Sequence, residues 1–415
     1  MKILYVIPYS PANPTFGGSL RIYNILNHLC ANHDVTVAGF SSPEEEKQLI
    51  ENFPVLAGNT HFVEEPFSQG SPYRVFIKSL FSLHSMWYLN TRSVKLQQKL
   101  DEICSNGSFD IIQCEFPVMS MFKFKSRAVK ILDAHNVEYD NFKRMAQVKN
   151  LFKKLFYHLE SYKFYREETA VGRMQDALFV TSKRDISIFD ETFPKVPKYL
   201  VPNGVDEVYF YPTKTIPKHH SLIFIGMMKY VPNIDGINYF LDEIFPKIID
   251  VFPDTTITIV GKNPPKSITQ RASKNIIVTG FVDDTRPYMH EASVYVVPLR
   301  MGGGTRLKIL ETLATKIPLV TTSIGCEGID IEHKTHAMIA NNPGEFASTV
   351  IALFTNEDLR NKLIKSGYEL VMNDYRWINI GKEMDRIYDE LTGINTPADT
   401  NGEDRMKYES NGIYR

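Results

Sequence analysis

The chain has 415 residues, of which 43% are hydrophobic, 23% charged and 12% aromatic, a composition typical of a globular protein with more than one domain. Its 47 basic and 48 acidic residues leave a formal net charge of −1, so the overall charge does not favour binding to nucleic acid. The four cysteines form neither a CxxC pair nor a metal-ligand pattern, and no apolar run has the length of a signal peptide or a membrane span. We therefore expect a cytoplasmic protein that binds no nucleic acid.

The first forty residues predict a strand, a helix and a second strand. An apolar run at 3–7 is followed by a turn rich in proline and glycine that ends in Gly17 and Gly18, then by a helical stretch and an apolar run at 35–40. Further strands are predicted at 110–113, 129–132 and 177–180. This alternation favours a parallel α/β domain over residues 1–200.

A second α/β series follows a segment at 201–217 that we expect to be the interdomain linker, because the strand and helix pattern breaks around 201–206 and the stretch at 212–220 is polar and basic. Its predicted strands are 222–225, 256–260, 276–279, 293–297 and 318–321. We expect this domain to span 218–375, a C-terminal helix at 376–391 to pack back toward the N-terminal domain, and the tail at 392–415 to be disordered. The predicted fold class is α/β, with two Rossmann-like, doubly wound domains facing a cleft. Because ligands bind parallel sheets beyond the carboxyl ends of the strands, functional residues should lie directly after strands.

The segment most typical of an anion site follows the predicted strand at 293–297. Gly302, Gly303 and Gly304 lead through Thr305 into a predicted helix, and such a loop lets backbone amides and the helix dipole meet a phosphate. The dipole contributes about 0.3 to 2 kcal/mol and a hydrogen bond to a charged group about 1.5 to 3, so Arg306 and Lys308 are expected to hold a diphosphate. Glu311, one turn after Lys308, is placed to accept hydrogen bonds from ribose hydroxyls. A plain glycine turn with a solvated basic pair is the alternative.

With its other motifs, the chain resembles the family 4 retaining glycosyltransferases of the GT-B fold, the glycosyl transferases of group 1, from Met1 to about Leu391. The further matching pieces are Gly17-Gly18, Asp133-Ala134-His135-Asn136, Val201-Pro202-Asn203-Gly204-Val205-Asp206 and Gly280-Phe281-Val282. The resemblance implies a hexosyltransferase that moves a sugar from a nucleotide-diphosphate sugar to a glycan, lipid-linked or other hydroxyl acceptor in polysaccharide or glycoconjugate biosynthesis.

The resemblance also implies roles for single residues. Glu311 matches the last Glu of the family's Glu-x7-Glu motif, which holds the donor ribose, and His135 matches a histidine that contacts the transferring sugar or the acceptor. Phe281 and Val282 match positions that contact the base, with the end of a core strand as the alternative. Gly17 and Gly18 either let the backbone come close to a phosphate or to the acceptor, or form a plain turn between a strand and a helix. A histidine such as His135, taken by itself, is equally typical of a structural hydrogen-bonding residue.

Two departures from the family pattern concern the donor. Gly303 stands where the family has the first Glu of the motif, which contacts the donor sugar, and Met227 stands where many members have an arginine after the glycine that matches Gly226. Lys229 could supply one charge to the diphosphate. We hypothesise that Arg306 and Lys308 compensate for the missing arginine. They would then be catalytic residues, together with His135.

A helix is predicted over 151–166, with an apolar face and several basic residues on its other faces. The apolar face comprises Leu151, Phe152, Leu155, Phe156, Leu159 and Tyr162. Such a helix either packs against a core or rests on an anionic membrane and brings the protein to a lipid-linked acceptor. The second interpretation adds a peripheral location at the inner face of the membrane.

No DxD triplet and no GxxxxGK sequence occurs, so the sequence predicts no metal ion and no cofactor beyond the nucleotide-sugar donor. In retaining transferases of this kind the acceptor is thought to attack on the face from which the diphosphate leaves, and the leaving phosphate takes the proton. Two other functions stay open. One is a nucleotide-sugar epimerase of the same fold, and the other is a non-catalytic nucleotide-sugar-binding partner of another transferase.

Overall fold

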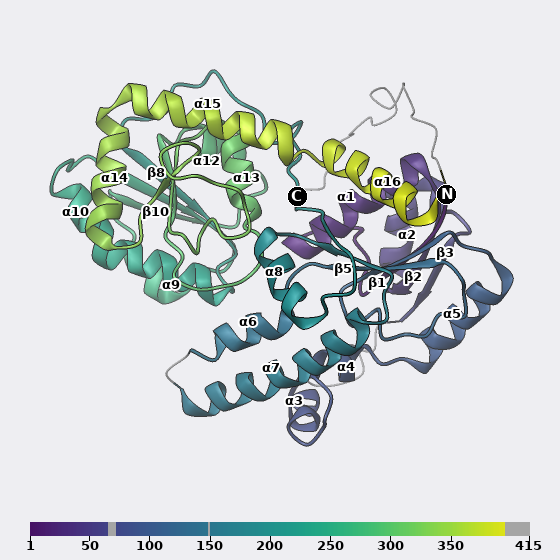
Figure 1. Cartoon of the computed structure of the whole chain (residues 1–415). Helices are drawn as coiled ribbons and strands as arrows, with labels where there is room; N and C mark the ends of the chain where they lie inside the picture. Colours follow the sequence, from purple (N-terminus) through teal and green to yellow (C-terminus); the bar gives the residue numbers. More distant parts are fainter. Residues whose placement is uncertain (65–71, 148–149, 395–415) are drawn as a thin grey trace. The chain divides into compact units, whose positions relative to one another are not determined.

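The computed structural model describes residues 1–64, 72–147 and 150–394, and the chain divides into two units (Figure 1). Unit 1 comprises Met1–Pro202 and the described residues from Ile380 onward, and unit 2 comprises Asn203–Asn379. Of the tail at 392–415 that was predicted to be disordered, Thr392 is instead the last residue of a helix, and residues 395–415 lie outside the described residues. In the described part of the chain, no helix is long and apolar enough to cross a membrane.

The described part of unit 1 holds a seven-stranded parallel sheet with the strand order β3-β2-β1-β4-β5-β6-β7. Its strands are β1 (Lys2–Ile7), β2 (Asp34–Phe40), β3 (Thr60–Val63), β4 (Ile111–Glu115), β5 (Val129–Ala134), β6 (Ala177–Val180) and β7 (Lys198–Leu200). All five strands predicted for this half are confirmed. The short strands β3 and β7 were missed, because each lies at a sheet edge with only half-buried side chains and so lacks the apolar run of a central strand.

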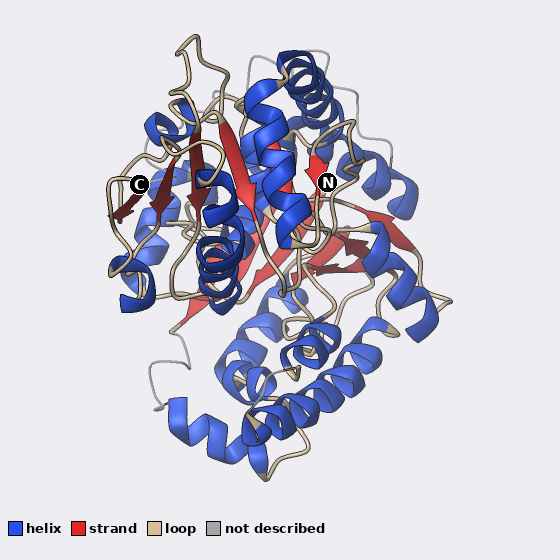
Figure 2. Ribbon diagram, turned by 90° about the vertical axis from the view of Figure 1, so that its left-hand side faces the viewer, coloured by secondary structure: helices blue, strands red, loops and turns tan. Residues whose placement is uncertain are grey.

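Helices cover both faces of this sheet (Figure 2). They are α1 (Gly17–Asn32), α2 (Pro43–Asn52), the 3-10 helix η1 (Pro54–Leu56), α3 (Pro72–Leu80), α4 (Met86–Thr91), α5 (Val94–Asn106), α6 (Glu138–Met145), α7 (Leu151–Gly172) and α8 (Lys183–Thr192). Gly17 and Gly18, predicted to end a turn, are the first two residues of α1. Asn150 caps α7, since its side chain accepts a hydrogen bond from the backbone N–H of Lys153.

The last helix, α16 (Trp377–Thr392), belongs to unit 1 from Ile380 onward, where the Tyr388 hydroxyl donates to Gln113 of β4. One turn earlier on α16, Oδ1 of Asp385 lies 2.9 Å from Nε2 of His28, on α1, and 2.9 Å from Nε2 of His33, directly before β2. Burial favours the neutral carboxyl, but the hydrogen bonds from the two histidines outweigh it and hold the pKa of Asp385 below its ordinary value.

Asp385→Ala is expected to destabilise unit 1 by about 3 kcal/mol, because it leaves two buried imidazoles without their acceptor. The lowered pKa of Asp385 means that its contribution is complete above the ordinary aspartate pKa and is lost as the pH falls below about 4. Urea unfolding at neutral and acidic pH measures this. A destabilisation that did not shrink in acid would contradict the assignment, and Lys382→Ala, at an exposed position of the same helix, is the control.

The described part of unit 2 holds a six-stranded parallel sheet with the order β10-β9-β8-β11-β12-β13. Its strands are β8 (Ser221–Ile225), β9 (Thr256–Val260), β10 (Ile276–Gly280), β11 (Val294–Val297), β12 (Leu319–Thr321) and β13 (Met338–Ile339). Its helices are α9 (Val231–Tyr239), the π-helix η3 (Phe240–Ile244), α10 (Phe245–Ile249), α11 (Lys266–Thr269), α12 (Arg286–His290), α13 (Leu307–Ala314), α14 (Pro343–Thr355) and α15 (Glu357–Asp374). The five predicted strands are confirmed, and only the two-residue β13 was missed.

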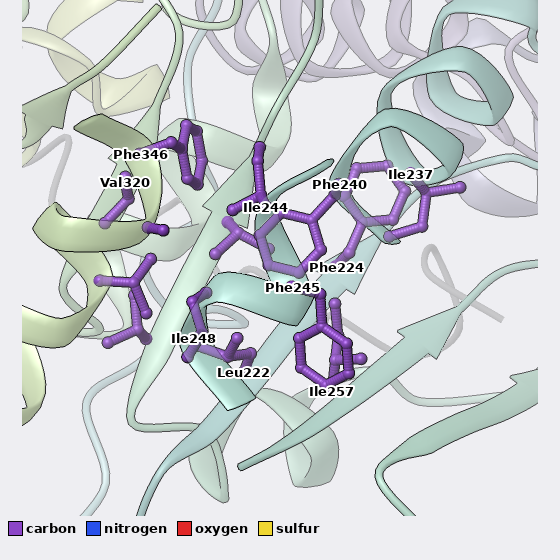
Figure 3. Close-up of a cluster of buried hydrophobic side chains, with 14 of the residues drawn as sticks. Leu222, Phe224, Ile237, Phe240, Ile244, Phe245, Ile248, Ile257, Val320 and Phe346 are labelled. Carbon is purple, nitrogen blue, oxygen red and sulfur yellow. The ribbon is translucent and has the colours of Figure 1, made fainter. Parts of the chain in front are cut away.

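The core of unit 2 lies on both faces of its sheet. On one face, strand residues such as Leu222 and Phe224 pack against Ile237, Phe240 and Phe346 from the covering helices (Figure 3). On the other face Val297 and Leu299 pack against Ile309 and Leu313 of α13. This apolar contact fixes the position of α13 against the sheet. The loop between β11 and α13 is therefore anchored at both ends, at the carboxyl end of the sheet.

Candidate functional site

The loop 298–306 of unit 2 connects β11 to α13 and contains the three glycines. Gly302 and Gly304 have φ values of 118° and 75°, a region that favours glycine. A Cβ atom on Gly302 would lie 2.9 Å from Nη2 of Arg306. The backbone conformation therefore favours glycine at two of the three positions, and at Gly302 a side chain would also displace the end of Arg306.

Arg306 is buried beneath this loop. Its Nη1 donates hydrogen bonds to the carbonyl oxygens of Gly303 and Gly304. The guanidinium thus braces the glycine loop from inside. Arg306 was predicted to contact a diphosphate, and that role stays a prediction, but its placement assigns it a second task in holding the loop.

Lys308, in the first turn of α13, places its ammonium group beside the end of β8. Its Nζ donates to Oδ1 of Asn233 at 3.0 Å and lies 4.7 Å from the ring centroid of Phe224. The Nδ2 group of Asn233 in turn donates to the carbonyl oxygen of Met227 at 3.0 Å. A Cβ atom on Gly226 would come within 2.9 Å of Lys308 Nζ. The glycine after β8 therefore leaves room for the ammonium group that enters from α13.

Lys308 and Glu311 form an electrostatic pair on one face of α13. Burial and the nearby Arg306 lower the pKa of Lys308 to about 7, against the opposing effect of Glu311. Burial raises the pKa of Glu311 to about 7, against the opposing effect of Lys308. The charged form of each group is therefore poorly stabilised in the free protein. A bound anion would stabilise the ammonium group of Lys308, and hydroxyl donors on the same ligand would stabilise the carboxylate of Glu311.

The other residues of unit 2 that were predicted for the donor lie around the same edge of its sheet, after β8 and β10, whereas Gly17 and Gly18 lie in α1 of unit 1. Met227 and Lys229 are exposed beyond β8. Phe281 is 58% exposed directly after β10, and Nζ of Lys262 lies 5.4 Å from its ring centroid. Val282 packs against the core, which fits the alternative of a core position. The structure thus brings Gly226, Lys308 and Glu311 to one edge with the glycine loop and leaves Phe281 as an open aromatic face.

In unit 1, His135 follows β5 and pairs with a carboxylate that the sequence did not indicate. Its Nε2 lies 2.6 Å from Oε2 of Glu115, the last residue of β4, and both side chains are buried. Phe116, with a φ of 67°, stacks its ring 3.9 Å from the imidazole centroid. Nδ1 of His135 makes no hydrogen bond with any residue in the described ranges. One ring nitrogen is therefore committed to Glu115 and the other is available.

A buried arginine lies beneath this pair. The guanidinium of Arg21 on α1 contacts both oxygens of Asp133 at 2.9 to 3.2 Å and donates to the carbonyl of Pro202 at 3.0 Å. Burial raises the pKa of Asp133 to about 6 and that of Glu115 to about 7, in each case against the effect of Arg21. Burial lowers the pKa of His135 to about 3, so its imidazole is neutral at physiological pH.

Aromatic side chains surround the Glu115–His135 pair. The Phe116 ring contacts those of Tyr9 and Trp87, at 6.2 and 5.8 Å between centroids, and Tyr9 contacts the exposed Phe16. A Cβ atom on Gly18 would lie 2.7 Å from the Tyr9 hydroxyl. A pocket of about 420 Å³ opens nearby between α4, α5 and the residues after β4, lined by side chains that include Tyr88, Val118 and Phe122. Gly18 and His135 thus belong to one aromatic-lined region.

Sequence reasoning missed Glu115, Arg21 and Asn233. The predicted strand at 110–113 stopped short of Glu115, although a carboxylate at the end of a fully buried strand is an unusual placement that signals a buried partner. The sequence did not indicate Arg21 or Asn233, because a polar residue within a predicted helix is expected to face solvent until the packing of that helix is known.

Comparisons with known proteins concern the family and the fold of the chain. Residues 219–356 match the family model described as glycosyl transferases group 1. The 44.6 kDa protein in the cps region of Klebsiella pneumoniae is 23% identical over 390 residues, covering 90% of this chain and 96% of that protein. The phosphatidyl-myo-inositol mannosyltransferase of Mycobacterium leprae is 25% identical over 178 residues, 41% of this chain and 46% of the relative.

Solved structures share the fold at low sequence identity. TarM aligns with a TM-score of 0.66 at 12% identity, covering 94% of this chain and 99% of that chain. HepE of Anabaena in complex with UDP aligns with a TM-score of 0.65 at 12% identity, covering 94% of this chain and 100% of that chain. Both doubly wound, parallel-sheet units are therefore those of the GT-B fold.

Proposed function

Because the chain belongs to the glycosyl transferases of group 1 and has the GT-B fold, we propose that it is a retaining hexosyltransferase. Its donor is a nucleotide-diphosphate sugar, and its acceptor is a hydroxyl group of a glycan or of a lipid-linked molecule made in polysaccharide or glycoconjugate biosynthesis. The observation that carries the proposal is the half-buried ammonium of Lys308, which Asn233 holds beside Gly226 at the carboxyl end of β8. A cation in that place, next to a glycine loop and a helix N-terminus, suits a diphosphate.

In this proposal unit 2 binds the donor. The diphosphate accepts hydrogen bonds from Lys308 and from the backbone amides of residues 302–304, while Glu311 accepts from the ribose hydroxyls and Phe281 offers a face for the base. HepE, a protein of the same fold, has been crystallised with UDP and with UDP-glucose, which supports a nucleotide-sugar donor. Gly303 offers no carboxylate to the sugar, so the sugar must be recognised by other groups.

Unit 1 then contributes to the sugar and the acceptor. His135 presents its Nδ1 to a hydroxyl of the transferring sugar or of the acceptor, and Glu115 fixes the orientation of the ring. The aromatic side chains around Phe116 and Gly18 supply apolar faces of the kind on which sugar rings stack. The mannosyltransferase relative acts, by its name, on a lipid, phosphatidyl-myo-inositol, which supports a lipid-linked acceptor here.

The chemical step forms a bond between the acceptor oxygen and the anomeric carbon on the face from which the diphosphate departs. The bond from the anomeric carbon to the phosphate oxygen breaks, and the acceptor proton passes to the leaving phosphate. Lys308 and the loop amides stabilise the charge that develops on the diphosphate. In this scheme no protein carboxylate acts as nucleophile, and no metal ion is required.

Turnover assays test the proposal directly. The purified protein is incubated with a panel of nucleotide sugars, with and without a cell extract that contains acceptors, and nucleotide release is measured. Release that depends on the extract is expected. Interconversion of the sugar without an acceptor would instead identify an epimerase, and binding without either reaction would identify a non-catalytic partner, and each of these would overturn the transferase proposal.

Glu311→Gln is expected to weaken the binding of the nucleoside diphosphate about tenfold and to leave inorganic pyrophosphate binding unchanged, because only the ribose contact is lost. Calorimetric titration with both ligands measures the difference. Glu332→Gln, an exposed glutamate of the same unit, serves as control. An equal loss for both ligands would show that Glu311 acts through Lys308 rather than on the ribose.

A further inference from the structure

Unit 1 exposes a surface of large apolar side chains where α3 meets the beginning of α7, which we call the α3–α7 surface. Phe81 is 90% exposed and Phe152 is 84% exposed. Around them lie further exposed apolar side chains, namely Ile77, Leu83, Leu151 and Leu155. The alternative of a core-packed helix, which the sequence left open for the segment from Leu151, is therefore wrong for the first two turns of α7.

This surface is held in place by buried contacts. The rings of Phe76 and Phe156 lie 4.8 Å apart between the two helices. Beneath them Lys163 pairs with Glu160 at 2.9 Å and donates to the carbonyl oxygen of Ser79 at 2.5 Å, and all three side chains are buried. Figure 1 shows α3 beside α7 in this arrangement. The apolar side chains are thus displayed by a packed pair of helices.

The two stretches of chain that carry the surface contain basic but no acidic residues. The sequence has no Asp or Glu between Pro66 and Leu100, and none between Asn141 and Leu159, although the whole chain has 48 acidic residues. The exposed charged side chains of these two segments include Lys78, Lys143, Lys153 and Lys154. Next to Leu83, Nδ1 of His84 lies 3.3 Å from the carboxylate of Glu167, whose side chain is 10% exposed. Exposed apolar groups on basic segments without acidic residues suit an anionic lipid surface, whereas a second copy of the same surface would meet like charge.

The α3–α7 surface lies beyond the same edge of the sheet as His135, the edge at the carboxyl ends of the strands. Glu168 of α7 accepts a hydrogen bond from the backbone N–H of Glu138, at the start of α6, three residues after His135. From there α7 runs back to Leu151, about 25 Å at 1.5 Å per residue. The other end of α7 lies at the opposite edge, where the carboxylate of Asp176, four residues after the helix, accepts a hydrogen bond from the backbone N–H of Lys130 at the beginning of β5. The exposed turns of α7 therefore project beyond the carboxyl ends of the strands.

We propose that the α3–α7 surface docks unit 1 on a bilayer containing anionic lipid. Phe81 and Phe152, with the neighbouring leucines, enter the interface between headgroups and acyl chains, and the lysines meet the lipid phosphates. The docking requires no turnover, so it stands apart from the transferase proposal. It also places the carboxyl ends of β4 and β5 toward the membrane, as a lipid-linked acceptor would need.

Vesicle flotation of the full chain tests the docking. Binding is expected to vesicles of phosphatidylcholine mixed with phosphatidylglycerol, to weaken as salt is added, and to be much weaker for phosphatidylcholine alone. Phe152→Ser combined with Leu155→Ser, and separately Lys153→Glu combined with Lys154→Glu, should each lower the partition coefficient by at least about tenfold. Val251→Ser, an exposed apolar residue of unit 2, should leave it unchanged.

Absence of wild-type binding to either vesicle would overturn the proposal, as would equal binding by the wild type and both double variants. Equal binding to neutral and anionic vesicles would also overturn it. Sedimentation analysis checks whether a wild-type dimer, lost in the Phe152 variant, occupies the surface instead. Nucleotide release with a soluble acceptor is expected to stay unchanged in all these variants, so failure of docking remains distinguishable from failure of the transferase activity.

Discussion

Lys308→Met is expected to weaken binding of a nucleotide-diphosphate sugar by about ten- to hundredfold and to lower kcat/KM by at least as much. The substitution keeps most of the aliphatic stem, which passes over Phe224, and removes the ammonium group that Asn233 holds beside Gly226. A hydrogen bond to a charged group contributes about 1.5 to 3 kcal/mol, and the negative charge on the leaving diphosphate grows in the transition state. The loss in kcat should therefore accompany the loss in affinity.

The same residue should make donor binding depend on pH. The pKa of Lys308 is lowered to about 7 in the free protein, so the side chain is charged below that pH and loses its proton above it. Since the diphosphate requires the charged form, affinity is expected to fall as the pH rises above about 7, by up to tenfold per unit. Calorimetric titration across this range should show proton uptake on binding. Lys308→Arg, which stays charged, should flatten the dependence.

Two further variants isolate the effect of Lys308. Lys362→Met removes an exposed lysine of α15 in the same unit and should change neither affinity nor turnover. Asn233→Ala leaves the ammonium group in place but releases it from its partner, so a smaller loss than that of Lys308→Met is expected. Affinity within about twofold of wild type in Lys308→Met, with the fold intact by thermal unfolding, would refute the assignment of the diphosphate to this site.

The fold could be predicted from sequence wherever a strand is buried on both faces. β1, β6 and β11 are continuous apolar runs because parallel strands are covered by helices on both sides, and each was predicted within a residue or two. β3 and β13 carry weaker patterns because an edge strand buries less of each side chain, and β13 has only two residues. For α7 the sequence left two interpretations open, a core-packed and a membrane-facing helix, since helical periodicity locates an apolar face but not what covers it.

A candidate site can be proposed from sequence where a motif places the chemistry along the chain. Lys308 and Glu311 follow the glycine loop at fixed spacing, and the structure adds that the ammonium group of Lys308 lies beside Gly226, while the roles of both residues toward a donor stay predictions. Asn233 and Glu115 could not be found in this way, because each becomes significant only through a partner that is distant in sequence. Arg306 shows another limit of the sequence. A basic residue at a glycine loop suggests a phosphate contact, which stays a prediction, but the sequence did not indicate that the guanidinium also donates to two carbonyl oxygens of the loop itself.

His135→Ala is expected to lower kcat by about ten- to hundredfold while the affinity for the nucleoside diphosphate stays within twofold, because the lost hydrogen bond concerns the sugar or the acceptor and not the nucleotide. His135→Gln, which can restore one hydrogen bond, should recover part of the rate. A nucleotide affinity that fell together with kcat would contradict this division of labour. Gln175→Ala, at the far end of α7, controls for nonspecific changes in unit 1.

Glu115 should control the direction of that hydrogen bond. The pKa of Glu115 is raised to about 7 by burial, whereas that of His135 is lowered to about 3, so the pair gains one proton on the carboxyl as the pH falls through 7. The ionised carboxylate can only accept, which fixes the proton of His135 on Nε2 and leaves Nδ1 as an acceptor. A protonated Glu115 can donate to Nε2, and the imidazole then carries its proton on Nδ1.

This exchange predicts a step in the pH profile. If Nδ1 accepts a hydrogen bond from a substrate hydroxyl, kcat rises with pH through about 7 in the wild type, because the productive tautomer requires the ionised Glu115. In Glu115→Gln the partner has no titration in this range, so the step should disappear although some activity remains. Steady-state rates at saturating donor and acceptor, measured from about pH 5.5 to 8.5, decide the matter. A step that persists in Glu115→Gln must arise elsewhere, and Glu115 would then be a structural partner of His135 without control over its proton.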